Sequence, residues 1–589
     1  MTCEEVRRGG AGLELFEPLC GDVEECLRGS SVFDSIVGDA RRELVDSFDG
    51  VRLRTGEVLM SEGEVADALY LVRHGRLRTT VAGADGSPVQ VGQVGKSEVV
   101  GEMALITDER RSATVTAMRD TDLYRLPADA FAAFTQAHPE VLRPFAGVVV
   151  ARLRDALTGS THASLPATIV LVPTPGARAD ELAHAISRSI GNYDTATVSS
   201  VDAADRANPA AWLLDVENAV DVSLLVADDT PTAWTKQCLR HADRVLIVAD
   251  QSRPAALTPV EADPECAKRL AELPVELVMR YRSHATSSRW LRDRTLDAHH
   301  NLRDGSADDI ARLVRRITGD ATVLVLGGGG ARGFAHVGVI RALLESGIDI
   351  DAVVGASAGA VVGGGFAHSG DLDAVEGALL GWFDAVRWRR DMNPPALALL
   401  TGRLMTEGFQ EFFGDWRIED LGRDFAAVSC DLTAAAPFVH TEGPLWQAIR
   451  ASAAVPGIFP PVALEGRVLV DGGLVANLPV DIAKHRHQGA HVIAVEVGDP
   501  TGIEAGHLDG SGIANGWRRS VSRSGNTPTL PRILMRLTEL GRSDNPEDAD
   551  TVIRPDVRGF GLTDTKPART IIDRGYQAAV ATIEAEGLE

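Results

Sequence analysis

Apolar and polar positions alternate over short runs between Val51 and Leu126. Alternation with a period of two is typical of strands that bury one face. The runs lie at 51–54, 69–72, 77–81 and 89–91, separated by turns at Gly56, Gly63, Gly75, Gly83 and Gly86. Many short strands at this spacing predict a small β-barrel or jelly roll. A helical pattern follows at about 128–157.

The pattern changes after a predicted linker at 160–166. Mostly apolar runs at 168–172, 222–226, 245–248 and 275–278 alternate with helical stretches. Such runs are typical of a parallel sheet covered by helices. A third region opens with the apolar run 322–326 and alternates in the same way. Within it, 499–529 is rich in Gly, Ser, Asn and Asp and predicts a mobile insertion, and 570–586 predicts a closing helix.

These patterns predict a multidomain chain of 589 residues. The expected parts are an N-terminal lead-in (1–30), a β-barrel or jelly-roll domain (31–157), a middle α/β domain (167–317) and a C-terminal α/β domain (321–589, core 322–484).

Charge and cysteine content narrow the possible partners. The net charge of -24 argues against a nucleic-acid binder and against a polybasic clamp on anionic lipid. The six cysteines are scattered without zinc-like spacing, and no apolar run reaches the ~18–20 residues needed to span a bilayer. We therefore expect a soluble, cytoplasmic protein that binds no metal, with peripheral membrane contact left open. The oligomeric state is not indicated.

A glycine-rich loop, Gly327-Gly-Gly-Gly-Ala-Arg-Gly333, stands between an expected strand and an expected helix. Backbone N–H groups that converge at a helix N-terminus bind a phosphate or a developing oxyanion. Gly328, Gly330 and Gly333 also fit the dinucleotide fingerprint. However, the next strand leads into a second motif rather than a ribose-binding acid, so dinucleotide binding is a distant alternative.

That second motif is Gly355-Ala-Ser357-Ala-Gly359, the pattern of a nucleophile elbow. A third, Asp471-Gly472-Gly473, follows the apolar run 468–470. A serine hydroxyl needs a base, and a carboxylate at a strand end can serve. The alternative for Asp471 is a turn-capping aspartate, which is common before Gly-Gly.

A Ser-His-Asp triad is the alternative, because His485, His487 and His491 follow Asp471. The stretch 484–490, which contains His485 and His487, is typical of an exposed helix end. His336, beside the glycine-rich loop, reads as a helix-start residue.

A compact phosphate cassette is expected at residues 97–117. A Gly-Glu turn opens a helical turn whose N-terminus, with Arg111, can hold a cyclic phosphate, and Glu102 can accept from a ribose hydroxyl. The candidate nucleotide contacts are Gly101, Glu102, Ala104, Arg111 and Ser112. The alternative is a degenerate module used as a scaffold.

The three C-terminal motifs together resemble the patatin-like phospholipase family, and 429–433 and 451–461 fit it as well. The resemblance implies that Ser357 is the nucleophile and Asp471 the base of a Ser-Asp dyad. It places the oxyanion hole around Gly328, Gly329 and Gly330, with Arg332 and Gly333 shaping the loop. Gly355 and Gly359 would form the elbow.

Residues 31–157 resemble the cyclic-nucleotide-binding domain, although Arg110 stands where that family usually has proline. Residues 232–248 and 298–303 resemble the connecting region of the neuropathy target esterase subgroup. There, 172–176 lacks the Lys-Ser/Thr of a P-loop, and His299 and His300 have no acidic or cysteine partners at matching spacing. The middle domain is therefore expected to be a structural adaptor.

The order of the modules implies a lipid esterase that acts on lysophospholipids or phospholipids without a catalytic cofactor, with cAMP or cGMP as a possible allosteric ligand. The alternative is a nucleotide-sensing protein whose hydrolase domain is inactive.

Overall fold

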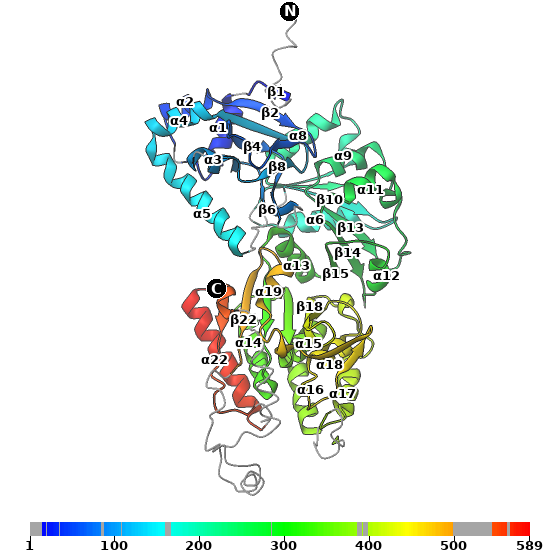
Figure 1. The fold of residues 1–589 in the computed structure, drawn as a ribbon. Helices are drawn as coiled ribbons and strands as arrows, with labels where there is room; N and C mark the ends of the chain where they lie inside the picture. The colour runs from blue at the N-terminus through cyan, green and yellow to red at the C-terminus, as the bar shows by residue number, and fades with distance from the viewer. Residues whose placement is uncertain are drawn as a thin grey trace, which may run out of the picture. The chain divides into compact units, whose positions relative to one another are not determined.

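The computed structural model describes residues 14–18, 20–34, 36–83, 88–107, 109–158, 167–191, 193–283, 285–385, 391–392, 398–498, 545–561 and 566–588. The chain forms two compact units, 1–280 with 290–319 and 281–289 with 320–589. Figure 1 shows their helices and strands. The insertion predicted at 499–529 lies outside the described residues.

The first part of the N-terminal unit is an antiparallel jelly roll, which confirms the predicted fold. Its two sheets have the strand orders β1-β2-β9-β4-β7 and β3-β8-β5-β6. Their apolar faces enclose a core that includes Leu53, Val72 and Leu123. The strands are β1 (Glu14–Phe16), β2 (Asp49–Leu53), β3 (Val58–Met60), β4 (Ala68–His74), β5 (Leu77–Ala82), β6 (Pro88–Val94), β7 (Val99–Val100), β8 (Thr114–Ala117) and β9 (Thr121–Pro127).

Helices flank this jelly roll and bury phenylalanines against it. Phe33, Phe131 and Phe145 meet edge to face, with ring centroids 5.4–5.5 Å apart. Pro139 separates two helices where the sequence predicted one helical stretch, because proline cannot continue a helix that precedes it. The helices are α1 (Cys20–Arg28), α2 (Asp39–Val45), α3 (Glu102–Thr107), α4 (Ala128–Ala137), the 3-10 turn η1 (Pro139–Val141) and α5 (Leu142–Thr158).

The second part of the N-terminal unit is a six-stranded sheet of order β11-β12-β10-β13-β14-β15. Its first five strands pair in parallel, and helices cover both faces in two apolar cores. The strands are β10 (Thr168–Pro173), β11 (Thr195–Ser199), β12 (Val222–Val226), β13 (Arg244–Asp250), β14 (Val275–Tyr281) and β15 (Ala298–Arg303). The helices are α6 (Ala179–Ser189), α7 (Ser200–Ala203), α8 (Pro209–Ala219), α9 (Ala233–His241), α10 (Pro259–Ala262), α11 (Pro264–Leu270), α12 (Ser288–Leu291) and α13 (Ala307–Thr318).

The C-terminal unit is an α/β fold around a mixed sheet of order β20-β21-β18-β17-β16-β22-β23, with β19 paired to β18. The central strands are parallel, and β21 runs antiparallel to β18. The strands are β16 (Thr322–Leu326), β17 (Ala352–Ala356), β18 (Asp424–Asp431), β19 (Ala436–His440), β20 (Val462–Leu464), β21 (Arg467–Asp471), β22 (His491–Val495) and β23 (Thr551–Ile553).

Helices pack on both faces of this sheet. The closing helix α22 lies against α14, and glycines let the two backbones meet: a Cβ on Gly338 would lie 1.9 Å from the carbonyl oxygen of Ile572. The helices and 3-10 turns are η2 (Gly330–Gly333), α14 (Phe334–Glu345), α15 (Ala358–Ser369), α16 (Leu372–Ala385), α17 (Arg403–Phe413), η4 (Ile418–Asp420), α18 (Leu445–Ser452), η5 (Gly472–Leu474), α19 (Val480–Arg486), η6 (Pro546–Asp548) and α22 (Ala568–Glu586).

Candidate active site

Ser357 occupies a sharp turn between β17 and α15. Its backbone adopts φ 53° and ψ -119°, a conformation that non-glycine residues adopt only under strain. The flanking glycines make the turn possible, because a Cβ on Gly355 would lie 2.6 Å from the amide nitrogen of Ala360 and one on Gly359 would lie 2.0 Å from the carbonyl oxygen of Leu326. The turn therefore has the geometry of a nucleophile elbow.

The hydroxyl of Ser357 donates a hydrogen bond of 2.7 Å to Oδ2 of Asp471. Asp471 ends β21, and its Oδ1 accepts a 2.9 Å bond from the N–H of Gly473. A Cβ on Gly472 would lie 2.1 Å from the carbonyl oxygen of Val428, so only glycine fits between Asp471 and β18. Both carboxylate oxygens are thus fixed, one toward the serine and one toward the backbone.

Asp471 is fully buried, and burial raises the pKa of its carboxyl group to about 6. The hydrogen bonds from Ser357 and Gly473 act in the opposite direction but do not cancel the loss of solvation. A carboxylate with a pKa near neutrality is a stronger base than an exposed aspartate and is still ionised at pH 7.

A second serine, Ser452, holds the elbow in place. Its hydroxyl accepts a 2.9 Å bond from the N–H of Ser357 and donates a 2.6 Å bond to the carbonyl oxygen of Val428. Sequence reasoning placed Ser452 in a family-like stretch but assigned it no role. The signal was too weak, since a serine at the end of a helix is common.

The glycine-rich loop runs from the end of β16 into η2. The N–H of Gly328 donates to the carbonyl oxygen of Asn477 at 3.0 Å, so this group is already occupied. In the described part of the chain, the N–H groups of Gly329 and Gly330 have no hydrogen-bond acceptor. Gly330 has φ 55°, and a Cβ on Gly333 would lie 2.6 Å from the Cβ of Ala358, beside the elbow.

Two side chains support the loop from behind. The guanidinium of Arg332 is buried and donates from Nε to the carbonyl oxygen of Phe560 at 2.9 Å. His336 is fully buried, which lowers its pKa to about 4, and its Nε2 lies 2.8 Å from the carbonyl oxygen of Gly327. A neutral His336 therefore donates to the loop backbone, which fixes the loop.

The histidines of the alternative triad lie elsewhere. His487 is 3.7 Å from Asp424, and His491 lies 3.3 Å from the hydroxyl of Thr551. Neither contacts Asp471, and His485 is exposed. The expectation of an exposed helix end is wrong for His487, which packs at the end of α19 with 9% of its surface exposed.

In the jelly roll, Gly101, Glu102 and Arg111 come together. Gly101 has φ 87°, and a Cβ there would lie 2.5 Å from Nη1 of Arg111. Arg111 is buried and donates to the carbonyl oxygens of Gly101 (3.0 Å) and Ala68 (2.8 Å) and to Asp67 (2.9 Å).

Glu102 is also buried and accepts a 2.5 Å bond from Nη1 of Arg152 on α5. Ala104 is buried on α3, and the exposed Ser112 contacts the sulfur of Met103 at 3.9 Å.

Comparison with protein families matches three regions of the chain. The patatin-like phospholipase family matches residues 324–484, the cyclic nucleotide-binding domain matches residues 50–138, and the neuropathy target esterase family P-loop like domain matches residues 198–318. The first match contains Ser357 and Asp471, and the second contains Gly101, Glu102 and Arg111.

Curated relatives carry names from the same families. Lysophospholipase nte1 of Aspergillus terreus is 28% identical over 90% of this chain and 41% of that protein. Patatin-like phospholipase domain-containing protein 7 of Rattus norvegicus is 30% identical over 78% of this chain and 39% of that protein. Neuropathy target esterase sws of Drosophila melanogaster is 30% identical over 83% and 39%. The chain thus spans about two fifths of the length of these relatives.

Among solved structures, a cyclic nucleotide-binding domain from Methylobacillus flagellatus is 21% identical over 26% of this chain and 93% of that chain, with a TM-score of 0.23. None of the helices in the described part of this chain combines the length and apolar character needed to cross a bilayer.

Proposed function

We propose that this chain, which matches the patatin-like phospholipase family and the neuropathy target esterase family P-loop like domain, is a serine esterase that hydrolyses fatty acyl esters of lysophospholipids or phospholipids. The observation that carries the proposal is the 2.7 Å hydrogen bond from the strained Ser357 to the buried Asp471. Relatives named lysophospholipases support the choice of substrate class.

In the proposed first half-reaction, Asp471 Oδ2 takes the proton of Ser357 while Oγ attacks the ester carbonyl carbon. The carbonyl oxygen becomes an oxyanion. The N–H groups of Gly329 and Gly330 are its proposed donors, because the N–H of Gly328 is bound to Asn477. Collapse of the intermediate expels the alcohol, which takes the proton back from Asp471, and leaves an acyl-serine.

In the second half-reaction, water attacks the acyl-serine with Asp471 again acting as the base. Fatty acid leaves and Ser357 recovers its proton. Asp471 passes the proton that it took from water back to Ser357 and returns to the ionised state. Side chains and backbone groups of this chain thus carry out every proton transfer and stabilise the oxyanion in the proposed reaction.

The test is release of fatty acid from lysophosphatidylcholine by wild-type protein and by Ser357→Ala. We expect release by the wild type that vanishes in the variant. Ser369→Ala, an exposed serine at the end of α15, is the matched control and should retain activity. If the wild type releases nothing above the Ser357→Ala baseline and leaves short-chain aryl esters untouched, the hydrolase proposal fails.

A second candidate function is cyclic-nucleotide sensing, supported by the placement of Gly101, Glu102 and Arg111 around one turn. Arg111 is held in place by Asp67 and two carbonyl oxygens, so its side chain is ordered before any phosphate arrives. We expect cAMP or cGMP to raise the melting temperature of the wild type. Arg111→Lys, which lacks the planar fork, should lose the shift. If neither nucleotide raises it at millimolar concentration, the module is a scaffold.

A further inference from the structure

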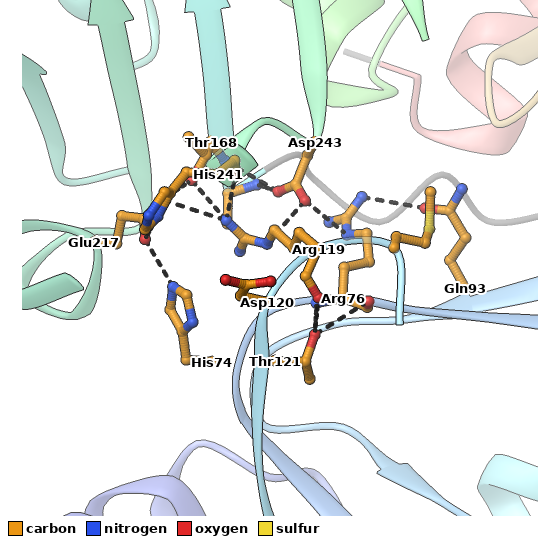
Figure 2. A network of polar contacts seen from close by, with 12 residues as sticks. His74, Arg76, Gln93, Arg119, Asp120, Thr121, Thr168, Glu217, His241 and Asp243 are labelled. Carbon is orange, nitrogen blue, oxygen red and sulfur yellow. Dashed lines mark hydrogen bonds and ion pairs between the residues drawn. The ribbon is translucent and has the colours of Figure 1, made fainter. Parts of the chain in front are cut away.

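Three buried ionisable side chains meet where the jelly roll contacts the parallel sheet of the N-terminal unit. His74 ends β4, Glu217 lies near the end of α8, and His241 ends α9. Each exposes 6–7% of its surface. Figure 2 shows both imidazoles beside one carboxylate. Oε2 of Glu217 lies 2.7 Å from Nε2 of His74 and 2.9 Å from Nδ1 of His241.

These atoms lie close enough together to share a metal ion once the side chains move slightly apart. The two ring nitrogens and the carboxylate oxygen all lie within 4.8 Å of one another. Two imidazoles and one carboxylate form a donor set that Zn²⁺ takes in proteins, with a fourth position left for solvent. The three residues come from segments 143 and 24 positions apart, so no local spacing in the sequence reveals the set.

The metal-free cluster is held by hydrogen bonds. Burial lowers the pKa of His74, so its ring is neutral at pH 7 and Nε2 can donate to Glu217. Burial alone would raise the pKa of Glu217, but hydrogen bonds from His241 and His74 and the charge of Arg119 outweigh burial and hold it well below its usual value. The carboxylate is therefore ionised in the metal-free protein.

Outer groups already orient two of the three ligands. The hydroxyl of Thr168 donates to Oε1 of Glu217 at 2.6 Å, which leaves Oε2 directed at the imidazoles. Nε2 of His241 lies 2.8 Å from the amide nitrogen of Gln237. If His241 Nδ1 binds a metal, Nε2 carries the proton, and a turn of the Gln237 amide places its oxygen as the acceptor. Such supporting contacts are typical of metal ligands.

Two buried arginines, Arg119 and Arg76, lie close by and share the carboxylate of Asp243. Nη1 of Arg119 is 3.3 Å from Oε1 of Glu217, on the carboxylate oxygen away from the imidazoles. Nε of Arg119 is 3.1 Å from the buried carboxylate of Asp243, which also accepts the N–H groups of Ala167 and Thr168. Because Asp243 also faces Arg76 at 3.8 Å, it offsets the repulsion between Arg119 and a metal only in part, and this repulsion lowers the affinity of the site.

We propose that His74, Glu217 and His241 bind Zn²⁺ or another divalent cation that prefers imidazole, and that this ion fastens the cyclic-nucleotide-binding module to the connecting domain. His74 belongs to the former, and Glu217 and His241 to the latter. Without the ion, the same three side chains form the hydrogen bonds seen in the structure. On metal binding, Nε2 of His74 and Nδ1 of His241 give up their hydrogen bonds to Glu217.

The test uses the untagged full-length chain, stripped with a chelator and titrated with Co²⁺, whose visible absorption bands report nitrogen and oxygen ligands at low coordination number. We expect one Co²⁺ per chain with intense bands, displacement by Zn²⁺, and a rise in melting temperature of about 5 °C at saturating Zn²⁺. These measurements need no variant.

Two variants keep the hydrogen bonds but remove the ligands. His74→Gln and His241→Asn each place an amide N–H where the wild type has the ring nitrogen that faces Glu217. Both should fold and lose the Co²⁺ bands and the Zn²⁺ shift. His184→Asn, an exposed histidine on α6, should keep both.

The proposal is overturned if stripped wild type shows no Co²⁺ bands and no Zn²⁺ shift, in which case the cluster is a hydrogen-bonded lock only. It is also overturned if His74→Gln and His241→Asn bind Co²⁺ as the wild type does, because the ion then lies elsewhere.

Discussion

The carboxylate of Asp471 is fully buried and accepts a 2.7 Å hydrogen bond from the hydroxyl of Ser357, 114 positions away in the chain. Burial raises the pKa of Asp471 to about 6, so below that pH the base is protonated and inactive. We expect kcat/KM for a soluble aryl ester to fall about tenfold per pH unit below 6 and to level off above about 7. A flat profile between pH 5 and 8 would remove Asp471 from the role of base.

The same shift predicts how Asp471→Asn changes stability. The folded state holds the Asp471 proton more tightly than the unfolded chain does, so this group stabilises the fold at low pH. That contribution is lost as pH rises through about 6, at a cost of roughly 3 kcal/mol. Asn cannot ionise. We therefore expect Asp471→Asn to melt several degrees above wild type at pH 8 and to lose that advantage near pH 4.

Activity and stability should thus change in opposite directions in this variant. Asp471→Asn should lower kcat by roughly 10³-fold or more, because no base remains for Ser357. Calorimetry and ester hydrolysis on one preparation check both expectations. If the variant is less stable than the wild type at pH 8, burial of the ionised carboxylate does not destabilise the fold.

Ser452→Ala should impair catalysis through the position of Ser357. Its hydroxyl bonds the N–H of Ser357 and the carbonyl oxygen of Val428, so its loss leaves a buried N–H unpaired at the strained turn. We expect kcat to fall about 10- to 100-fold with little change in KM, and stability to fall by about 1–3 kcal/mol.

The control is Thr551→Val. Thr551 lies on β23, the outermost strand of the same sheet, and its buried hydroxyl donates to Glu586 of α22. Thr551→Val should show a comparable loss of stability with kcat near wild type. If the two variants lose kcat equally, Ser452 acts only through stability.

Much of the candidate site could be predicted because its motifs are local. A glycine pattern around Ser357 and an aspartate after an apolar run are contiguous in sequence, and each specifies a turn at the end of a strand. The glycine-rich loop was predicted for the same reason. The sequence does not show which of its N–H groups is free, because the acceptor for the N–H of Gly328 is the carbonyl oxygen of Asn477, about 150 positions further along the chain.

Groups that act through distant contacts were missed for a physical reason. Ser452 reaches Ser357 only because α18 ends beside the elbow, and His74 reaches Glu217 only because two domains meet. His487 was expected to be exposed because it follows Lys484 and Arg486 in a polar stretch, but at the end of α19 its ring lies 3.7 Å from Asp424. The polarity of the neighbouring residues in the sequence does not reveal such burial.

The backbones of α14 and α22 meet at two glycines, Gly338 and Gly575. A Cβ on Gly338 would lie 1.9 Å from the carbonyl oxygen of Ile572, and one on Gly575 would lie 2.0 Å from that of Ala335. The two backbones must therefore separate in Gly338→Ala or Gly575→Ala, at a cost of at least about 2 kcal/mol. Because α14 follows the glycine-rich loop directly, we also expect esterase activity to fall.

Gly377→Ala on α16 is the matched control, because a Cβ there meets nothing within 4 Å. Alanine favours the helix, so this variant should be as stable as wild type or more stable by about 0.5–1 kcal/mol. Thermal melts of the three variants check the opposite signs. If Gly338→Ala or Gly575→Ala melts at or above Gly377→Ala, the close crossing of α14 and α22 does not stabilise the fold, and the closing helix can shift without loss.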